Sequence, residues 1–142
     1  MPEPSIRFKK TWEDVDFYEL QMEFKCANCK AHIDIYTSNE ELEELRKGIN
    51  YFCNLSINEF TWKSGNETEN VTHFISIRFF KHNNRGHIGL ELTVDNKLEV
   101  PEKMNANFFI ITEINQLDDF VKKLERLINE EIIELEGILP VY

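Results

Sequence analysis

The sequence is poor in cysteine, in glycine and proline, and in long apolar runs. It has 3 cysteines, an odd number, and no apolar run follows its first residues, which argues against a secreted disulfide framework and favours a reducing cytoplasm. Glycine and proline number only 5 and 4, which excludes a fibrous or low-complexity chain. No apolar run approaches the ~20 residues that span a bilayer, so we expect no membrane partner.

Basic residues are scarce relative to acidic ones. The 16 Lys and Arg residues face 26 Asp and Glu residues, and the formal net charge is -10. Such a charge repels phosphate backbones and anionic lipid headgroups. We therefore expect no nucleic-acid partner, and we expect a basic partner to be attracted to the most acidic stretch, residues 117–137.

The sequence does contain a regular apolar pattern. Hydrophobic residues make up 42 % of its 142 residues, including 11 Phe, which is enough to bury a core. A period of two predicts strands, and apolar spacings of three and four predict helices. The expected strands are 5–10 (weak, at an edge), 17–26, 31–37, 55–63, 71–80, 87–94 and 106–112, and the expected helices are 39–52 and 117–128, the second with a continuation towards Leu135 before Gly137.

Together these elements predict a single α+β domain over residues 1–142. In it, a mostly antiparallel sheet of about six strands carries two helices packed on one face. Ser38 and Glu41 have the spacing of a capping box, which places the start of the first helix. Apolar positions change parity between Ile57 and Phe60, which indicates a bulge or a strand buried on both sides. The apolar tail 138–142 is expected to pack against the core.

The segment Cys26-Ala-Asn-Cys29 is the candidate for metal or redox chemistry. Together with His32 and Cys53 it would supply a zinc site if the first helix returned Cys53 to the hairpin tip. One CxxC without a second pair, and without the flanking pattern of a thioredoxin-type site, is a weak signal. Cys26 and Cys53 also continue apolar faces, so small buried hydrophobes are the favoured interpretation.

No arrangement typical of catalysis is found in the sequence. A Gly-rich phosphate loop, a serine nucleophile elbow and an HExxH helix are all absent. His73, His82 and His87 do not converge in the predicted sheet, and neighbouring acids on a helix point in different directions. We therefore expect a protein that is not an enzyme and that carries no cofactor and no metal.

Some aromatic residues of the predicted strands point to the face of the sheet opposite to the one that the helices cover. The helices therefore cannot bury them. Trp62 and Phe80 are examples. Either other segments of the chain cover them, or they form a partner surface or a homodimer seam, in which aromatic anchors supply most of the affinity.

Several segments carry a resemblance to a known family. They are Ile33-Asp-Ile-Tyr-Thr37 leading into Glu41-Leu-Glu-Glu-Leu45, then Ile75-Ser-Ile-Arg-Phe79, Arg85-Gly-His-Ile-Gly-Leu-Glu-Leu92, and Phe108-Phe-Ile-Ile-Thr-Glu-Ile-Asn-Gln-Leu117 running to Phe120-Val-Lys-Lys-Leu124. Their arrangement resembles the WapI-type immunity proteins of bacterial contact-dependent and polymorphic toxin systems, over about two thirds of the chain. The resemblance implies a non-enzymatic protein that binds one cognate toxin domain and blocks it.

The first hypothesis is therefore a cytoplasmic bacterial immunity protein that neutralises a cognate toxin, in the first place a nuclease, by stoichiometric occlusion. The second hypothesis is a CxxC-containing metal-binding or redox module, and the third is a homodimeric structural protein without a toxin partner. The residues expected to contact a partner are Glu40, Glu44, Asp118, Asp119, Glu125, Trp62 and Phe80.

Overall fold

The computed structural model describes residues 3–54, 57–65 and 72–141. Within these ranges the chain forms eight strands and two helices. Their bounds are β1 Ile6–Glu13, β2 Tyr18–Lys25, β3 Lys30–Thr37, α1 Asn39–Cys53, β4 Glu59–Gly65, β5 Phe74–Lys81, β6 His87–Asp95, β7 Asn105–Glu113, α2 Ile114–Ile128 and β8 Glu134–Gly137.

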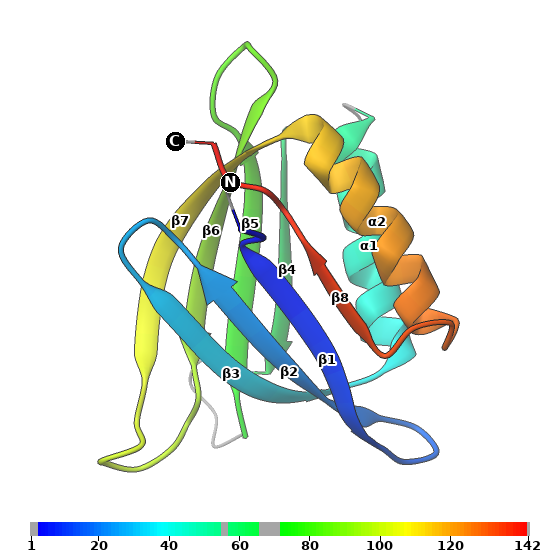
Figure 1. Ribbon diagram of the computed structural model, residues 1–142, viewed down its shortest axis with the longest axis vertical. Coiled ribbons are helices and arrows are strands. Elements are labelled where there is room, and N and C mark those ends of the chain that lie inside the picture. The colour runs from blue at the N-terminus through cyan, green and yellow to red at the C-terminus, as the bar shows by residue number, and fades with distance from the viewer. Residues whose placement is uncertain (1–2, 55–56, 66–71, 142) are drawn as a thin grey trace.

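The strands form two antiparallel sheets of four. The first sheet has the order β3-β2-β1-β8, and the second has the order β4-β5-β6-β7. The two sheets face each other, and both helices lie along one side of the pair, next to the edge strands β8 and β4 (Figure 1). The predicted α+β class with antiparallel strands and two helices is confirmed. The strands, however, number eight in two sheets instead of about six in one.

The side chains between the two sheets form one continuous core. Alternate residues of β2 are buried, as are alternate residues of β3, because one face of each strand points inward and the other points to solvent. Aromatic rings connect the layers. The centre of the Phe24 ring in the first sheet lies 6.4 Å from that of Phe108 in the second sheet, and the ring centres of Phe8 and Phe120 of α2 lie 5.7 Å apart. Burying each side chain of this size contributes about 1.5–3 kcal/mol to folding.

Helix α1 begins where the sequence predicts. The Ser38 hydroxyl accepts a hydrogen bond from the Glu41 amide at 3.3 Å, which satisfies one of the free amides of the first turn. The Glu41 carboxylate accepts from the Thr37 hydroxyl at 2.6 Å, instead of reaching back to the Ser38 amide. On its buried side the helix approaches β4 closely at Gly48, where an added Cβ would lie 1.9 Å from the Phe60 ring.

The predicted continuation of the second helix is wrong. Helix α2 ends at Ile128, and Glu130 adopts a positive φ of 62°, a conformation that turns the chain out of a right-handed helix. The chain then returns as β8, whose Gly137 pairs with Ile6 of β1. Strand β1 is therefore not the edge strand that the sequence suggested, because it has β2 on one side and β8 on the other.

The parity change near Ile57 also has a different cause from the one expected. Strand β4 begins at Glu59, so Ile57 precedes the strand and is exposed. Residues 55–56 and 71 of the predicted strands lie outside the described residues. The prediction for the C-terminal tail is confirmed over its described part: Ile138 is fully buried, and the Leu139 carbonyl accepts from the Thr112 hydroxyl of β7 at 2.7 Å.

Candidate functional site

Acidic side chains gather around a shallow depression at one end of the molecule. The depression lies between the β1–β2 loop, the start of α1 and the turn after α2, which meet at the lower right of Figure 1. Five of its described lining residues are carboxylates, and none of the described ones is Lys or Arg. The described lining residues are Glu13, Asp14, Val15, Asp16, Phe17, Tyr18, Ser38, Asn39, Glu40 and Glu130. We call this surface the acidic end.

The β1–β2 loop presents apolar side chains in the middle of these acids. The loop is held by a bond from the Asp14 amide to the Phe17 carbonyl at 2.8 Å and one from the Val15 amide to the Asp14 carboxylate at 2.7 Å. Val15 is 93 % exposed and Phe17 is also exposed. The acidic end therefore combines negative charge with exposed apolar side chains.

A buried cation lies beneath the acidic end. The Lys10 ammonium donates to the Leu127 carbonyl at 2.8 Å and sits 4.4 Å from the centre of the Tyr18 ring. Burial lowers the pKa of Lys10, and Glu13 and Glu130 oppose that change. Burial also raises the pKa of Tyr18 well above its usual value, with further contributions from Glu13, Glu41 and Glu130. Burial is the larger cause in both residues, and the smaller contributions of the carboxylates, which raise both pKa values, reflect the negative charge at this end.

The acidic residues predicted from the sequence fall into two groups. Glu40 lines the acidic end, and Glu44 lies one turn further along α1, in a groove that also contacts Ile128 of α2. Glu125 faces Arg46 of α1, whose pKa it helps to raise after the larger effect of the Glu43 hydrogen bond.

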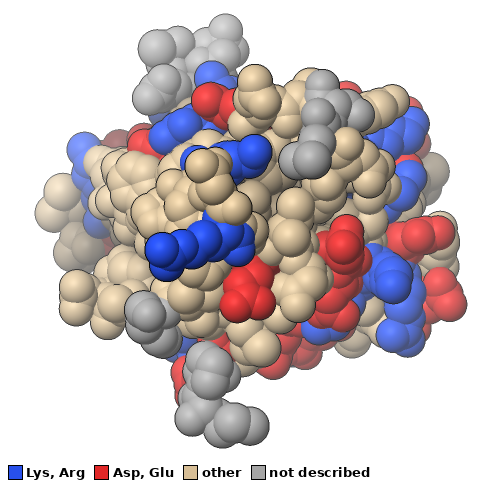
Figure 2. Space-filling view, turned by 90° about the horizontal axis from the view of Figure 1, so that it is seen from above, with Lys and Arg blue, Asp and Glu red and all other residues tan. Residues whose placement is uncertain are grey.

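Asp118 and Asp119 lie near the other end of the helix pair. Asp118 is close enough to Cys53, the last residue of α1, to contribute to its raised pKa, and Asp119 pairs with Lys123 at 2.9 Å. Viewed from the end opposite to the acidic end, acidic side chains gather mainly on the side where the helices lie, with Lys and Arg side chains among them. Further Lys and Arg side chains lie near the centre of a largely uncharged surface (Figure 2).

The two aromatic residues expected to contact a partner have different positions. Trp62 is only 3 % exposed and its indole N–H donates to the Glu41 carbonyl at 2.9 Å. The Trp62 ring therefore holds β4 against α1 and is not available to a partner, which corrects that assignment.

Phe80 lies on the outer face of the second sheet. Its ring is 6.2 Å from that of Phe109, which is 50 % exposed, and the Arg78 guanidinium lies 4.4 Å from the Phe80 ring centre. The ring covers Gly89, where an added Cβ would lie 2.2 Å away. This small aromatic patch remains a second candidate contact surface, since aromatic and Arg side chains dominate interfaces.

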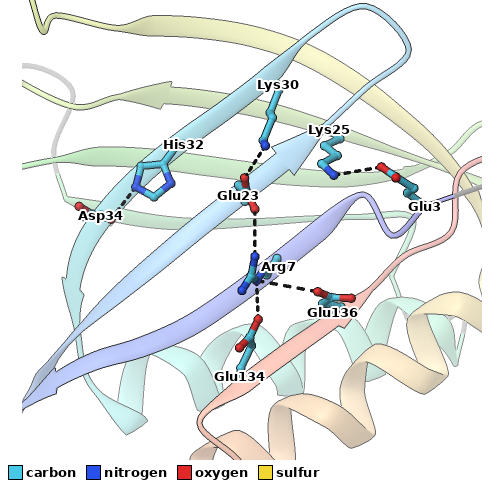
Figure 3. Close-up of polar contacts among 9 residues, drawn as sticks. All are labelled: Glu3, Arg7, Glu23, Lys25, Lys30, His32, Asp34, Glu134 and Glu136. Atoms are coloured by element: carbon cyan, nitrogen blue, oxygen red, sulfur yellow. Dashed lines mark hydrogen bonds and ion pairs between the residues drawn. The ribbon is translucent and has the colours of Figure 1, made fainter.

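The outer face of the first sheet carries a network of ion pairs that the sequence analysis missed (Figure 3). Arg7 of β1 pairs with Glu134 and Glu136 of β8 and with Glu23 of β2, and Glu23 also pairs with Lys30 at 2.8 Å. The alternation of β2 and β3 places Glu23 and Lys30 on the same face of the sheet. The pairing of Arg7 with β8 could not be foreseen, because β8 was not predicted. The network neutralises much of its own charge, so this face differs from the acidic end.

The cysteines do not form the four-ligand set that the metal-binding hypothesis requires, and Cys26 and Cys53 are only partly buried, not fully buried as the favoured interpretation expected. Cys26 and Cys29 form a disulfide at the tip of the β2–β3 hairpin, with 5.2 Å between their Cα atoms. Cys53 is a free thiol, half-buried at the end of α1, and burial raises its pKa to about 12, with a smaller contribution from Asp118. His32 faces Asp34 at 2.9 Å. Among the residues that the structure describes, no three His, Cys, Asp or Glu side chains converge as metal ligands would.

Comparison with known proteins finds a similarity of fold. No family model matches the sequence, and no curated protein sequence matches it. The fold is similar to that of one chain in the CdiA-CT/CdiI toxin and immunity complex from Enterobacter cloacae, with a TM-score of 0.50 and 10 % sequence identity, over 84 % of this chain and 97 % of that chain. At this identity the likeness shows the fold. Among the described residues, no helix combines the length and apolar character needed to cross a membrane.

Proposed function

We propose that this chain is an immunity protein of the bacterial cytoplasm, which binds a cognate toxin domain and neutralises it by occlusion, without catalysing a reaction. The observation that carries the proposal is the acidic end, where five carboxylates surround the exposed side chains of Val15 and Phe17. The fold adds support, because its structural neighbour is part of a toxin and immunity complex. The resemblance to WapI-type immunity proteins adds support from the sequence.

The charge of the chain favours the role of immunity protein over that of toxin. A toxin that cleaves nucleic acid needs a basic groove for its polyanionic substrate, whereas this chain has a net charge of -10. An acidic inhibitor is attracted to such a groove, and the attraction raises the rate of association at low salt. We therefore propose a nuclease as the toxin.

The acidic end suits the contact better than the other charged surfaces do. On the outer face of the first sheet, Arg7 is already paired with three carboxylates, so little charge is left to attract a partner. At the acidic end, Glu40 and Glu130 lie beside other acids. Basic side chains of the toxin would supply the missing counter-charges, and Val15 would be buried by the contact.

The test is to purify this chain with the C-terminal domain of a large secreted protein encoded beside it, and to measure binding at several salt concentrations. We expect a one-to-one complex, inhibition of the toxin domain, and an association rate that falls about tenfold or more from low to physiological salt. Absence of a complex would contradict the proposal, and salt-independent association would contradict the steering role.

Two matched variants test the location of the contact. Changing Glu40, Glu44 and Glu130 to Gln removes three charges at or next to the acidic end, and we expect much weaker binding. Changing Glu113 to Gln and Asp118 and Asp119 to Asn removes three charges near the start of α2, and we expect a smaller effect. The reverse order would place the contact at the other end of the helix pair.

The disulfide favours a second candidate function, a redox module. In it, the Cys26 and Cys29 thiols would each lose a proton while a disulfide of another molecule is reduced to two thiols. Without reductant, a thiol-specific reagent should then count one thiol, that of Cys53, and it should react slowly because its pKa is about 12. Cys29→Ser would abolish exchange with a small disulfide in this case, whereas the immunity proposal predicts unchanged toxin binding.

A further inference from the structure

In the described part of the chain, the two sheets have four edge strands, and other segments contact three of them, β7 at one end only. Helix α1 packs on β4 through Trp62. Helix α2 lies along β8, where the Lys123 ammonium donates to the Glu136 carbonyl at 2.6 Å. The tail after β8 pairs with the end of β7, where the Val141 amide donates to the Ile111 carbonyl at 2.7 Å. The remaining edge is β3, which lies on the side of the first sheet away from the helices (Figure 1).

Strand β3 is long and regular, as a strand must be to pair with another strand. Its eight residues pair with β2 without a register shift, and its side chains alternate between exposed and buried along the whole length. It contains no proline and no bulge, which are devices that natural proteins use to block an edge. Charged side chains are present on its outer face, but they have both signs: Lys30, His32 and Asp34.

The direction of the backbone groups of β3 follows from two hydrogen bonds. The Cys26 amide donates to the Cys29 carbonyl, so these residues form a hydrogen-bonded pair, and the Lys25 amide points the other way, to the Ser5 carbonyl. Because such pairs alternate along an antiparallel ladder, residues 30, 32, 34 and 36 of β3 turn their N–H and C=O groups away from β2. In the part of the chain that the structure describes, no other segment forms a backbone hydrogen bond with the outward-facing groups of these four residues.

We propose that β3 pairs with β3 of a second copy of this chain, antiparallel, about a two-fold axis at Ile33. In this register the even-numbered residues 30–36 form the hydrogen-bonded pairs, which matches the direction of their free backbone groups. Two such sheets would join into one continuous sheet of eight strands. The contact is isologous, as in most homodimers.

Side-chain chemistry favours this register. It places His32 opposite Asp34 of the second copy, on both sides of the axis, and Lys30 opposite Tyr36 of the second copy. Within one chain His32 and Asp34 already lie 2.9 Å apart on the outer face (Figure 3), so the four groups would form one cluster of donors and acceptors. On the inner side, Ile33 would meet its own copy, and Ala31 would meet Ile35.

The neighbouring registers fit less well. An axis at Asp34 places two carboxylates directly opposite each other, which is destabilising. An axis at His32 overlaps fewer residues of β3 and leaves Tyr36 without a cross-strand partner in the second copy's β3. Charge therefore argues against the axis at Asp34. Overlap argues against the axis at His32, although that axis would place Lys30 opposite Asp34.

A charge exchange tests both the dimer and its register. We expect the wild-type chain to sediment as a dimer, and we expect His32→Asp and Asp34→Lys to sediment as monomers, because each places like charges or unmatched groups opposite each other. The double variant H32D/D34K should dimerise again, since the carboxylate introduced at position 32 would face the ammonium introduced at position 34 of the second copy. Thr61→Asp, on the exposed outer face of β4, should remain a dimer.

A proline variant tests the backbone pairing of the two β3 strands. Asp34→Pro removes an N–H that points away from β2, so it should dissociate the dimer while circular dichroism and the urea midpoint change little; Ile33→Pro removes an N–H that bonds β2 and should lower the midpoint. A monomeric wild-type chain, a dimeric D34P, or a monomeric double variant would overturn the proposal. It does not depend on toxin binding, which the complex-formation assay measures separately.

Discussion

The two sheets differ in how their edges and outer faces are completed. In the second sheet α1 packs on β4 and the tail pairs with the end of β7, and the outer face carries the aromatic patch of Phe80 and Phe109 with Arg78 stacked on it. In the first sheet one edge is open, and the outer face is a network of ion pairs around Arg7. Among the described residues, other segments thus contact both edges of the second sheet, whereas the β3 edge of the first sheet has backbone groups left for association.

The largest expected effect tests the covered edge of the second sheet. Trp62→Ala removes a ring that is 3 % exposed, together with its bond to the Glu41 carbonyl. We expect a loss of about 3–5 kcal/mol in the free energy of unfolding, measured by urea denaturation. Thr61→Ala, the exposed neighbour on the same strand, should change it by less than about 0.5 kcal/mol. Equal effects would show that α1 does not depend on this contact.

A smaller effect is expected where α1 meets β4. Gly48→Ala places a methyl group 1.9 Å from the Phe60 ring, which is stacked on Phe79 at 5.8 Å and has little room to move. Overpacking of this kind costs about 1–3 kcal/mol, which exceeds the gain of about 1 kcal/mol that alanine brings to a helix. In the Phe60→Leu background the same change should be neutral or stabilising. Stabilisation by G48A alone would contradict the close approach.

The pH dependence of stability should report a buried histidine next to β5. His73 is 5 % exposed, with Ser64 at 2.9 Å and Thr72 at 3.2 Å from its ring nitrogens, and burial lowers its pKa from 6.5. Because the unfolded histidine binds a proton near pH 6.5 and the folded one does not, stability is full above that pH and falls as the pH is lowered below it. His73→Asn should show a shallower decline in urea midpoint. An unchanged slope would contradict a buried neutral ring.

The smallest effect is expected on the outer face of the first sheet. Arg7→Gln breaks several ion pairs, but these are exposed to solvent and contribute little. We expect the urea midpoint to change less than in Arg78→Gln, which also loses the contact with Phe80 on the second sheet. The measurement is the pair of midpoints at low and high salt. A larger loss for Arg7 would mean that the ion-pair network holds β8 in place.

Local pattern was sufficient to predict most of the second sheet and the start of α1, whereas α2 begins at Ile114, three residues before the predicted start. Strands β5, β6 and β7 alternate cleanly, and the hairpin between β5 and β6 turns at Gly86, which has a φ of 84°. The end of α2 was not predictable in this way. Ile128, Ile132 and Leu135 keep a helical spacing, and the left-handed conformation of Glu130 has no signature in a residue type that rarely adopts it. Strand β8 was missed for that reason.

The candidate site was only partly predictable, because it joins segments that are distant in sequence. Glu40 and Glu44 were expected from the charge of α1 alone. Asp14 and Asp16 come to the same place only because β1 ends and β2 begins beside the start of α1, and Glu130 only because α2 ends there. Trp62 was misplaced because its inward direction depends on where β4 begins, and Ile57 suggested an earlier start.

The strand order also bears on how the molecule folds. The second sheet joins consecutive strands, so each pairing closes a short loop. In the first sheet, by contrast, Ile6 pairs with Gly137, and that contact must bring together distant parts of the chain, which is slow because of the entropy of loop closure. The amides between β1 and β8 should therefore be the last to acquire protection from hydrogen exchange during refolding.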